Sequence, residues 1–366
     1  MQVLLLGGTG AMGISLKDIL AKRGDQVYLT SRSDHKDDRN IHYIKGDAHD
    51  DAFMTEILKD GYDAIVDFMI YGSGEFEKKA SRLLNSTDQY IFTSSSRVYA
   101  NSKTWITEKS PRLLDVCKDE DYLRTDEYAL AKAREENIII ECGKRNWTII
   151  RPYITYNTER IQLGGLEKDI WLRRALGGRS IPLPKDVANC QTTLTYGGDV
   201  AAAIAALIRN EKAYGEVFNL TGTEHMIWSD VAKIYLDVIK QTNNFIPEIY
   251  MPESSVELYQ KAGNGYQIIY DRLYNRVFDN AKLQAACGGN LTFCSIREGL
   301  TKCVTEFIEK PRWREDSPRV EAYLNRTFKE GLHMDCFTNK KSLIKYLGWY
   351  YIPGVMNTVR KLKCTH

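Results

Sequence analysis

The stretch VLLLGGTGAMG, from Val3 to Gly13, joins four apolar residues directly to a glycine-rich segment. A short, continuous apolar run that ends in glycine is typical of a strand buried on both faces, as in a parallel sheet. Gly7, Gly10 and Gly13 have the spacing GxxGxxG, and apolar residues then recur at helical spacing until Gly24. The stretch therefore predicts a strand, a tight turn and a helix, in that order.

The same alternation of apolar strand and helix continues to Pro152. The pattern predicts further strands at 26–30, 41–44, 64–68, 90–92 and 147–150, and helices at 11–22, 53–58, 76–84 and 125–142. Connections this short allow only right-handed crossovers between parallel strands. We therefore expect an α/β fold with a Rossmann-type, doubly wound parallel sheet.

Composition limits the class of protein. The 366 residues are 43% hydrophobic and have a formal net charge of +2, so nothing global indicates a nucleic-acid partner. The eight cysteines form no CxxC pair, which argues against a zinc site or a disulfide framework and suits a reducing compartment. No apolar run approaches ~20 residues, and the chain begins with a strand-like run rather than a secretory signal. We expect a cytoplasmic protein without a metal site.

The glycine-rich turn predicts a dinucleotide site. Its first glycine permits a tight turn, its second lets the backbone approach a pyrophosphate, and its third lets helix and strand pack closely. The N-terminus of the helix offers N–H groups and a positive dipole end to phosphates. The candidate cofactor-binding residues here are Gly7, Thr9, Gly10, Ala11, Met12 and Gly13. A plain glycine-rich loop is the alternative.

The end of the second strand bears on the choice of coenzyme. NAD sites usually have an acidic residue there, whereas this chain has Thr30-Ser31-Arg32. Arg32 can hold a 2′-phosphate, so NADP(H) is favoured and NAD(H) is the alternative. A solvated arginine near Asp34 is the simpler interpretation. Asp47, after the third strand, is placed to contact adenine or to cap the next helix.

Tyr128 and Lys132 lie one helical turn apart in the helix predicted at 125–142. Residues i and i+4 share a helix face, so the two polar groups can converge. The ordinary tyrosine pKa is ~10, and one ammonium about 5 Å away lowers it by an energy on the order of 3 kcal/mol at an effective dielectric of ~20. The polar run Thr93–Ser96 follows a strand and places a hydroxyl where a substrate carbonyl can be polarised.

These motifs together resemble the extended short-chain dehydrogenase/reductases, and more narrowly the NAD(P)-dependent nucleotide-sugar epimerase/dehydratase family. The matching segments are GxxGxxG at 7–13, SSRVY at 95–99, YxxxK at 128–132 and Arg-Pro at 151–152. The resemblance implies Tyr128 as the acid/base, Lys132 as its pKa tuner and ribose anchor, and Ser95 as the polarising hydroxyl, with Ser94 as the fallback. It also implies Phe68 as a cofactor contact.

Some residues depart from the family pattern. Dehydratases carry an acidic pair after the catalytic hydroxyl, where this chain has Ser96 and Arg97, so a dehydratase is disfavoured. The usual diphosphate-contacting arginine is replaced by Thr192. Arg272 or Arg276 would compensate, unless both are surface charges. The candidate substrate-binding residues are Ser95, Ser96, Asn157, Arg272 and Arg276.

The predicted domains are a dinucleotide-binding domain at 1–152, with later returns near 192–221, a smaller, irregular substrate-binding part at 153–310 and a C-terminal extension at 311–366. The extension has basic residues around the aromatic cluster 349–351, which suits either an anionic membrane surface or packing on the substrate domain. Pro353-Gly354 interrupts any long amphipathic helix and favours packing.

The leading hypothesis is an NAD(P)-dependent oxidoreductase or epimerase that acts on a nucleotide-linked sugar. The residues serve epimerisation and keto-sugar reduction equally. One alternative is a reductase of a non-sugar carbonyl, which Thr192 supports. Another is a non-catalytic nucleotide- or RNA-binding protein on the same fold. The resemblance also implies a homodimer formed by the helices that begin near Phe76 and Thr125.

Overall fold

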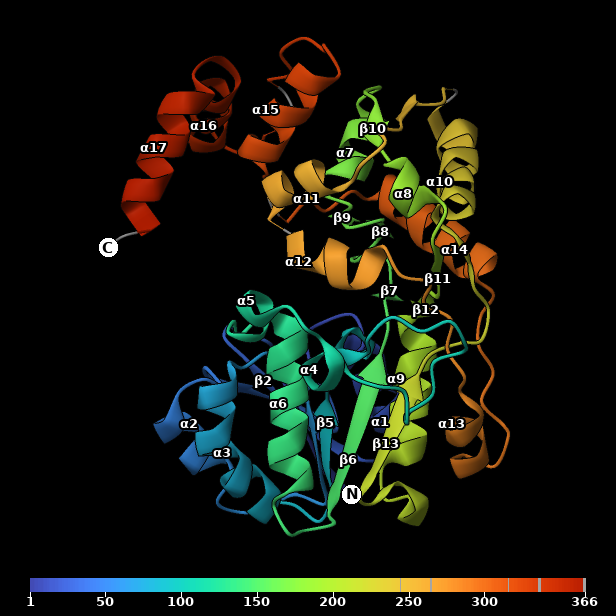
Figure 1. The fold of residues 1–366 in the computed structure, drawn as a ribbon. Helices are drawn as coiled ribbons and strands as arrows, with labels where there is room; N and C mark the ends of the chain where they lie inside the picture. Colours follow the sequence, from blue (N-terminus) through green and yellow to red (C-terminus); the bar gives the residue numbers. More distant parts are fainter. Residues whose placement is uncertain (244, 264, 315, 335–336, 365–366) are drawn as a thin grey trace. The chain divides into compact units, whose positions relative to one another are not determined.

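The computed structural model describes residues 1–243, 245–263, 265–314, 316–334 and 337–364 (Figure 1). The chain divides into two compact units. Unit 1 comprises residues 1–157, 192–225 and 275–299, and unit 2 comprises residues 158–191, 226–274 and 300–366. Three elements, β11 (Gln191–Thr192), β14 (Met226–Ile227) and α14 (Ile296–Glu309), lie where the chain passes from one unit to the other.

Unit 1 is built on a seven-stranded sheet in the order β13-β6-β5-β4-β1-β2-β3. Every pair of neighbouring strands is parallel. The strands are β1 (Gln2–Leu6), β2 (Gln26–Ser31), β3 (Ile41–Lys45), β4 (Ala64–Asp67), β5 (Tyr90–Thr93), β6 (Trp147–Pro152) and β13 (Glu216–Leu220). This order confirms the predicted Rossmann-type fold, and its topological switch lies between β1 and β4.

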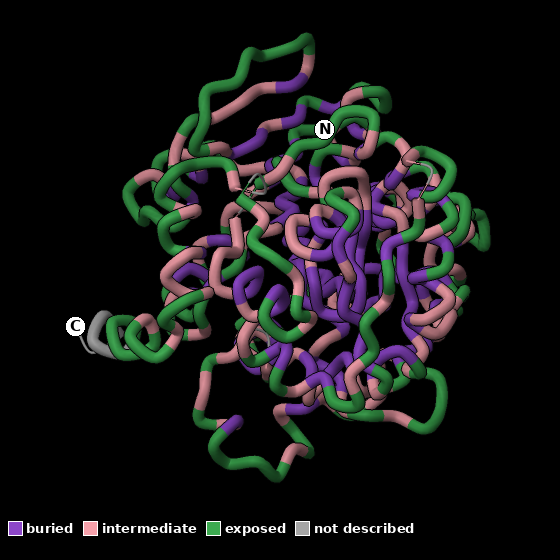
Figure 2. Tube along the Cα trace, turned by 90° about the horizontal axis from the view of Figure 1, so that it is seen from above, coloured by how far each residue is buried: buried purple, intermediate pink, exposed green. Residues whose placement is uncertain are grey.

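The sheet is buried on both faces because side chains alternate along each strand. Val3 and Leu5 join one hydrophobic cluster with residues of α1 (Gly13–Arg23) and α9 (Gly197–Leu207). Leu4 and Leu6 join the opposite cluster with residues of α2 (Asp51–Ile57), α3 (Ser73–Asn85) and α6 (Tyr128–Ile140). Buried residues accordingly concentrate along the central strands (Figure 2). The continuous apolar run at the start of the chain follows from this two-sided burial.

The remaining elements of unit 1 are short. They are η1 (Ser96–Val98), α4 (Leu113–Val116), α5 (Glu120–Leu123), β7 (Thr155–Tyr156), β12 (Thr195–Tyr196), η2 (Glu211–Ala213) and α13 (Ala281–Ala286). The last of these belongs to a late segment of the chain that returns to unit 1. There Ile106 bridges to Phe278, and Lys282 donates to the Val217 carbonyl at 2.7 Å.

A buried ionic network supports the carboxyl end of β6. Arg151 binds both carboxylate oxygens of Glu136, at 2.7 and 2.6 Å. Its third nitrogen donates to the Tyr99 hydroxyl at 2.8 Å, and that hydroxyl donates to Asn219. Arg112 adds a second cation to Glu136 at 3.1 Å. The arginine of the Arg-Pro motif therefore has a structural partner for each terminal nitrogen, which satisfies its buried charge.

Unit 2 consists mainly of helices. Its elements are β8 (Gln162–Leu163), β9 (Leu166–Glu167), α7 (Trp171–Leu176), β10 (Ile181–Pro182), α8 (Lys185–Ala188), α10 (Trp228–Asn243), β15 (Ile249–Tyr250), α11 (Val256–Ala262), α12 (Gly265–Gln267), the π-helical turn η3 (Ile268–Arg272), α15 (Pro318–Thr327), α16 (Lys340–Tyr351) and α17 (Pro353–Cys364). Among the described residues, we find no helix with the length and apolar character that crossing a membrane requires.

The C-terminal extension forms the last three helices of unit 2. Helix α15 packs against α16, where Asn325 donates to the buried Tyr346 hydroxyl at 2.8 Å. Helix α16 ends at Tyr351 and α17 begins at Pro353, so the proline separates the two helices as predicted. The extension is therefore packed within unit 2, while α17 leaves apolar side chains such as Val355 and Val359 exposed.

Candidate functional site

The turn between β1 and α1 has the backbone geometry that a phosphate-binding turn requires. Gly7 adopts a φ of 67°, and a Cβ there would lie 2.9 Å from the Met69 sulfur. A Cβ on Gly13 would lie 2.3 Å from the Gly8 carbonyl oxygen, so helix and turn can pack this closely only without one. A Cβ on Gly10 would meet no atom within 4 Å. Gly10 thus faces open space in which a ligand can approach the backbone.

The first turn of α1 is open to an anion. The helix begins at Gly13 instead of Ala11, and its N-cap residue Met12 accepts no side-chain hydrogen bond from the helix. No acidic residue lies in the first turn, whereas Lys22 and Arg23 lie in the last. The N–H groups at the start of α1 therefore keep their positive potential. These features fit a pyrophosphate group at the N-terminus of the helix.

The three serines after β5 differ in whether their hydroxyl donates a hydrogen bond within the protein. Ser94 donates to Glu136 at 2.6 Å, and Ser96 donates to the Arg151 carbonyl at 2.8 Å. Ser95 accepts a hydrogen bond from the Arg97 backbone N–H at 3.2 Å and donates to no described residue. Between the two hydroxyls considered from sequence, Ser95 is therefore the one whose proton is available to a ligand.

Tyr128 is the first residue of α6. The helix starts here, and not at the expected Thr125, because the Glu127 side chain caps it by accepting from the Ala129 N–H at 2.9 Å. The Tyr128 ring is half-buried, and the Arg97 guanidinium carbon lies 5.2 Å from the ring centroid. Arg97 also binds Glu127. The structure thus places a cation beside the phenol, at a position that the sequence analysis noted only as a departure from dehydratases.

Lys132 lies one turn further along α6 and is 1% exposed. Its ammonium donates to Glu135 at 2.9 Å and to the Met69 carbonyl at 3.3 Å, and it lies 4.5 Å from the centroid of the Phe92 ring. The sequence analysis did not identify Glu135. The sequence feature that could have identified Glu135 is its position three residues after Lys132, since residues i and i+3 share a helix face.

Burial raises the pKa of Glu135 to about 7, because desolvation outweighs the opposing effect of Lys132. The second carboxylate oxygen of Glu135 is buried and has no hydrogen-bond partner among the described residues. Asp67, at the end of β4, is also buried, and desolvation raises its pKa too. Asp67 accepts hydrogen bonds from the Tyr71 and Tyr90 hydroxyls. Two buried carboxyl groups therefore share the field of one buried ammonium.

The other predicted cofactor residues lie at the carboxyl ends of β2, β3 and β4. Arg32 and Asp47 are exposed, while Phe68 is half-buried against the α1 side of the sheet. The helix after β3 is capped by Asp50, not by Asp47, whose carboxylate accepts from the His49 N–H at 3.0 Å. Capping is thus no longer an explanation for Asp47.

The predicted substrate residues lie in both units. In unit 1, Asn157 follows β7 directly, and Arg276 is fully buried, donating to the Tyr99 and Ala100 carbonyls at 3.0 Å. In unit 2, Arg272 is 2% exposed and pairs with Asp271. The alternative that both arginines are surface charges is therefore wrong. Thr192 is buried as well.

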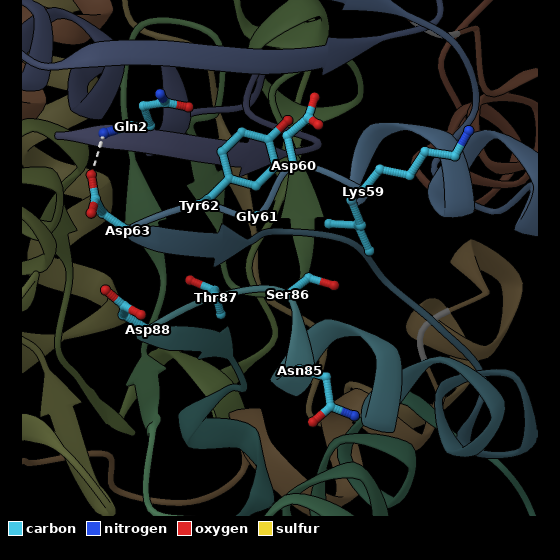
Figure 3. A pocket seen from close by; sticks show the side chains of 11 residues that line it. Gln2, Lys59, Asp60, Gly61, Tyr62, Asp63, Asn85, Ser86, Thr87 and Asp88 are labelled. Carbon is cyan, nitrogen blue, oxygen red and sulfur yellow. Dashed lines mark hydrogen bonds between the residues drawn. The ribbon is translucent and has the colours of Figure 1, made fainter.

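A cavity of about 570 Å³ opens at the opposite edge of the sheet (Figure 3). It is lined by residues at the amino ends of β1, β4 and β5, including Gln2, Tyr62 and Asp88. Ligands of doubly wound sheets bind at the carboxyl ends of the strands, so this cavity is separate from the candidate site. Two of its acidic side chains have partners: Asp63 accepts from the Gln2 N–H, and Asp88 pairs with Arg209.

Residues 3–221 match the model of the NAD dependent epimerase/dehydratase family. The chain belongs to this family. The match covers the glycine-rich turn, the serine run and the Tyr128/Lys132 pair, and so includes every candidate catalytic residue. This epimerase/dehydratase family member also resembles the "Chloroplast stem-loop binding protein of 41 kDa b" of Arabidopsis thaliana, with 29% identity over 248 residues. That match spans 63% of the chain and only 61% of the length of the relative.

Solved structures of epimerases share the fold of this family member. The epimerase Mth375 of Methanothermobacter thermautotrophicus has a TM-score of 0.65 and 18% identity, covering 84% of this chain and 93% of its own. The UDP-glucuronic acid 4-epimerase of Bacillus cereus, solved with UDP-glucuronic acid and NAD, has a TM-score of 0.63 and 15% identity, covering 85% and 100%. Identities this low establish the fold alone.

The raised pKa of Glu135 predicts how folding stability depends on pH. Its pKa in the folded protein, about 7, lies above the ordinary 4.5, so the folded state binds more protons between these values. The stabilisation present below pH 4.5 is therefore lost as the pH rises through 7. Glu135→Gln removes this loss. From pH 5 to pH 8, we expect the variant to gain stability relative to wild type, by on the order of 3 kcal/mol.

Thermal or denaturant unfolding at both pH values measures the difference. Glu141→Gln, at an exposed glutamate that ends the same helix, controls for the loss of one negative charge. If the stability difference between wild type and Glu135→Gln did not change with pH, the raised pKa of Glu135 would be contradicted.

Proposed function

We propose that the protein is an NAD(P)-dependent oxidoreductase or epimerase that acts on a nucleotide-linked sugar. The observation that supports this most strongly is the convergence of three elements at the carboxyl edge of one parallel sheet. They are the open phosphate-binding turn after β1, the Ser95 hydroxyl after β5, and Tyr128 with Lys132 on α6. The coenzyme, when bound, supplies the hydride chemistry. Family membership and the sugar-nucleotide ligand of the Bacillus cereus neighbour favour this substrate class.

In this proposal, Tyr128 takes or gives the proton of the reacting sugar hydroxyl, and Ser95 donates a hydrogen bond to the same oxygen. The two cations of this region are Arg97, which lies near the Tyr128 ring, and Lys132, one turn further along α6. The contribution of Lys132 depends on Glu135, since an ionised Glu135 neutralises the lysine and a protonated one does not. Lys132 is also the residue that would hold the nicotinamide ribose.

We propose that Arg32 selects NADP(H). Arg32 is exposed and makes no hydrogen bond or ion pair with any described residue. Two of the acidic residues nearby have other partners: Asp34 pairs with Lys45, and Asp37 accepts hydrogen bonds from His42 and the Tyr43 N–H. The guanidinium is therefore free to bind a 2′-phosphate. The Bacillus cereus neighbour was solved with NAD, so NAD is the competing expectation.

A second candidate function is RNA binding, which the name of the Arabidopsis relative favours. Both functions can use the same fold, because function resides in the site and not in the fold. They differ in what they require of Tyr128: catalysis needs its hydroxyl, whereas binding does not.

Gly10→Ala tests the dinucleotide site without disturbing the fold. A methyl group at this position meets no protein atom, so we expect an unchanged melting temperature but an affinity for NAD and NADP reduced by about tenfold or more, since the methyl group displaces the pyrophosphate. Gly74→Ala, at another glycine with open space, should change neither affinity. Titration calorimetry measures the coenzyme affinities, and scanning calorimetry measures the melting temperature. Full coenzyme affinity in Gly10→Ala would exclude this turn as the site.

Arg32→Gln tests coenzyme selection. Losing a charged hydrogen bond to the 2′-phosphate should weaken NADP binding by about tenfold and leave NAD binding unchanged. Lys36→Gln, which removes a positive charge from the same exposed segment, should affect neither coenzyme. An equal effect of Arg32→Gln on NAD and NADP, measured as dissociation constants, would refute selection by Arg32.

Tyr128→Phe tests catalysis directly. Hydride transfer, followed by nicotinamide absorbance with UDP-glucose or UDP-glucuronic acid, should fall by about 10²–10⁴-fold, because the acid/base is lost. Coenzyme affinity should not change. Tyr351→Phe, at a tyrosine that is 64% exposed, is the matched control. If Tyr128→Phe retained wild-type turnover, Tyr128 would not be the acid/base. RNA binding that is unaffected by Tyr128→Phe, in a protein without turnover, would support the second candidate.

A further inference from the structure

A second cavity, of about 310 Å³, lies within unit 2, where four helices meet. Each helix contributes residues of one face, which recur at helical spacing. They are Glu257, Gln260 and Lys261 from α11, Arg319, Tyr323 and Arg326 from α15, Trp349 from α16, and Pro353, Asn357 and Arg360 from α17. This volume is at the lower end of the range for small-molecule sites, about 300–1,000 Å³.

The lining of the cavity is strongly basic. Four cationic side chains line the cavity together with a single carboxylate, Glu257. None of the four cations forms an ion pair with a described acidic residue. The absence of counter-charge is unusual because Arg319 is half-buried, and a charge removed from water is normally paired.

Arg319 shows the imbalance most clearly. It is half-buried, its guanidinium donates to the Gln260 and Lys261 carbonyls, and it lies 5.9 Å from the Trp349 ring centroid. Burial and the nearby Arg360 lower the pKa of Arg319, which is the effect of a cation without an anionic partner. An anion bound between these two arginines would oppose both effects, because its negative charge favours the charged guanidinium.

The one acidic residue of α15, Glu321, lies on a different face of the helix. Glu321 pairs with Arg174 and Arg179, and Asn325 accepts from Arg174 at 2.7 Å. Helix α15 therefore has one face that neutralises buried arginines of unit 2 and another, carrying Arg319, that is left with positive charge. The separation of the two faces makes the basic lining a feature of the packed structure and not of overall charge, since the net charge of the chain is only +2.

We propose that this cavity binds a ligand bearing a phosphate or diphosphate group, held between Arg319 and Arg360 and flanked by Trp349. Planar guanidinium groups bind phosphate oxygens in pairs, which suits two or three arginines around one small cavity. Soluble organic phosphates and phospholipid headgroups share this chemistry. The site is independent of the dinucleotide turn, whose residues all belong to unit 1.

Isothermal titration of inorganic pyrophosphate into the full chain tests the proposal. The double variant Arg319→Gln/Arg360→Gln should bind at least about tenfold more weakly than wild type, since each charged hydrogen bond to phosphate corresponds to roughly that factor. Lys340→Gln/Lys345→Gln removes the same charge from exposed positions of α16 outside the cavity and should bind within about twofold of wild type. Any binding at the glycine-rich turn is common to all three proteins.

Vesicle flotation distinguishes the two sources of phosphate. Wild type and both double variants are compared on phosphatidylcholine vesicles with and without phosphatidic acid. Flotation that requires phosphatidic acid, is lost in Arg319→Gln/Arg360→Gln and is displaced by pyrophosphate identifies a lipid headgroup. Pyrophosphate binding that is weakened in Arg319→Gln/Arg360→Gln, without flotation, identifies a soluble ligand, and either result supports the site.

Two results would overturn the proposal. One is the absence of pyrophosphate and vesicle binding in wild type. The other is an equal loss of binding in both double variants, which would show a diffuse charge effect. Because Arg319 and Arg360 have no acidic partner among the described residues, their replacement should leave the far-UV circular dichroism spectrum and melting temperature close to those of wild type.

Discussion

Lys132 is a buried cation, and the candidate site is organised around the compensation of its charge. An ammonium that is 1% exposed is stable only with an anion and hydrogen-bond acceptors close by. Glu135 supplies the anion and the Met69 carbonyl supplies an acceptor. Met69 also lies against Gly7, so the lysine, the end of β4 and the glycine-rich turn form one connected structure. The position of the coenzyme turn and the position of the proposed catalytic helix are therefore linked.

This arrangement changes how Tyr128 is expected to be activated. A free ammonium one turn away would suffice to lower the pKa of a phenol, but Lys132 already has an anionic partner. Arg97, 5.2 Å from the Tyr128 ring centroid, is a second cation, and it too has an anionic partner, Glu127. Protonation of Glu135, whose pKa burial raises to about 7, would release the field of Lys132 at mildly acidic pH. The electrostatic environment of Tyr128 is thus set by a group of charges, not by a pair.

The sequence was sufficient to predict the sheet, because a strand buried on both faces leaves a continuous apolar signal. Two helix starts differ from the predictions because a side chain accepts a backbone N–H: capping by Glu127 starts α6 at Tyr128, and capping by Asp50 starts α2 at Asp51, two residues before the expected Phe53. Within the site, periodicity identified Tyr128 and Lys132. It could not show that Arg272 and Arg276 are buried, because their partners come from distant segments of the chain.

The cavity of unit 2 shows the same limit of sequence reasoning. Its basic side chains are contributed by three helices, α11, α15 and α17, and nothing in their local spacing indicates that they meet. Only the packing of the C-terminal extension places Arg319 and Arg360 together. A segment that suggested either membrane contact or simple packing thus acquires a specific chemical character from its tertiary contacts.

The most direct measurement of the central claim is the titration of the Glu135 carboxyl group by ¹³C NMR, with Glu135→Gln used to assign its resonance. A buried carboxyl that shares the field of Lys132 should titrate with a pKa of about 7. A pKa at or below the ordinary 4.5 would contradict this account, because it would mean that pairing with Lys132 outweighs the burial of the carboxyl group.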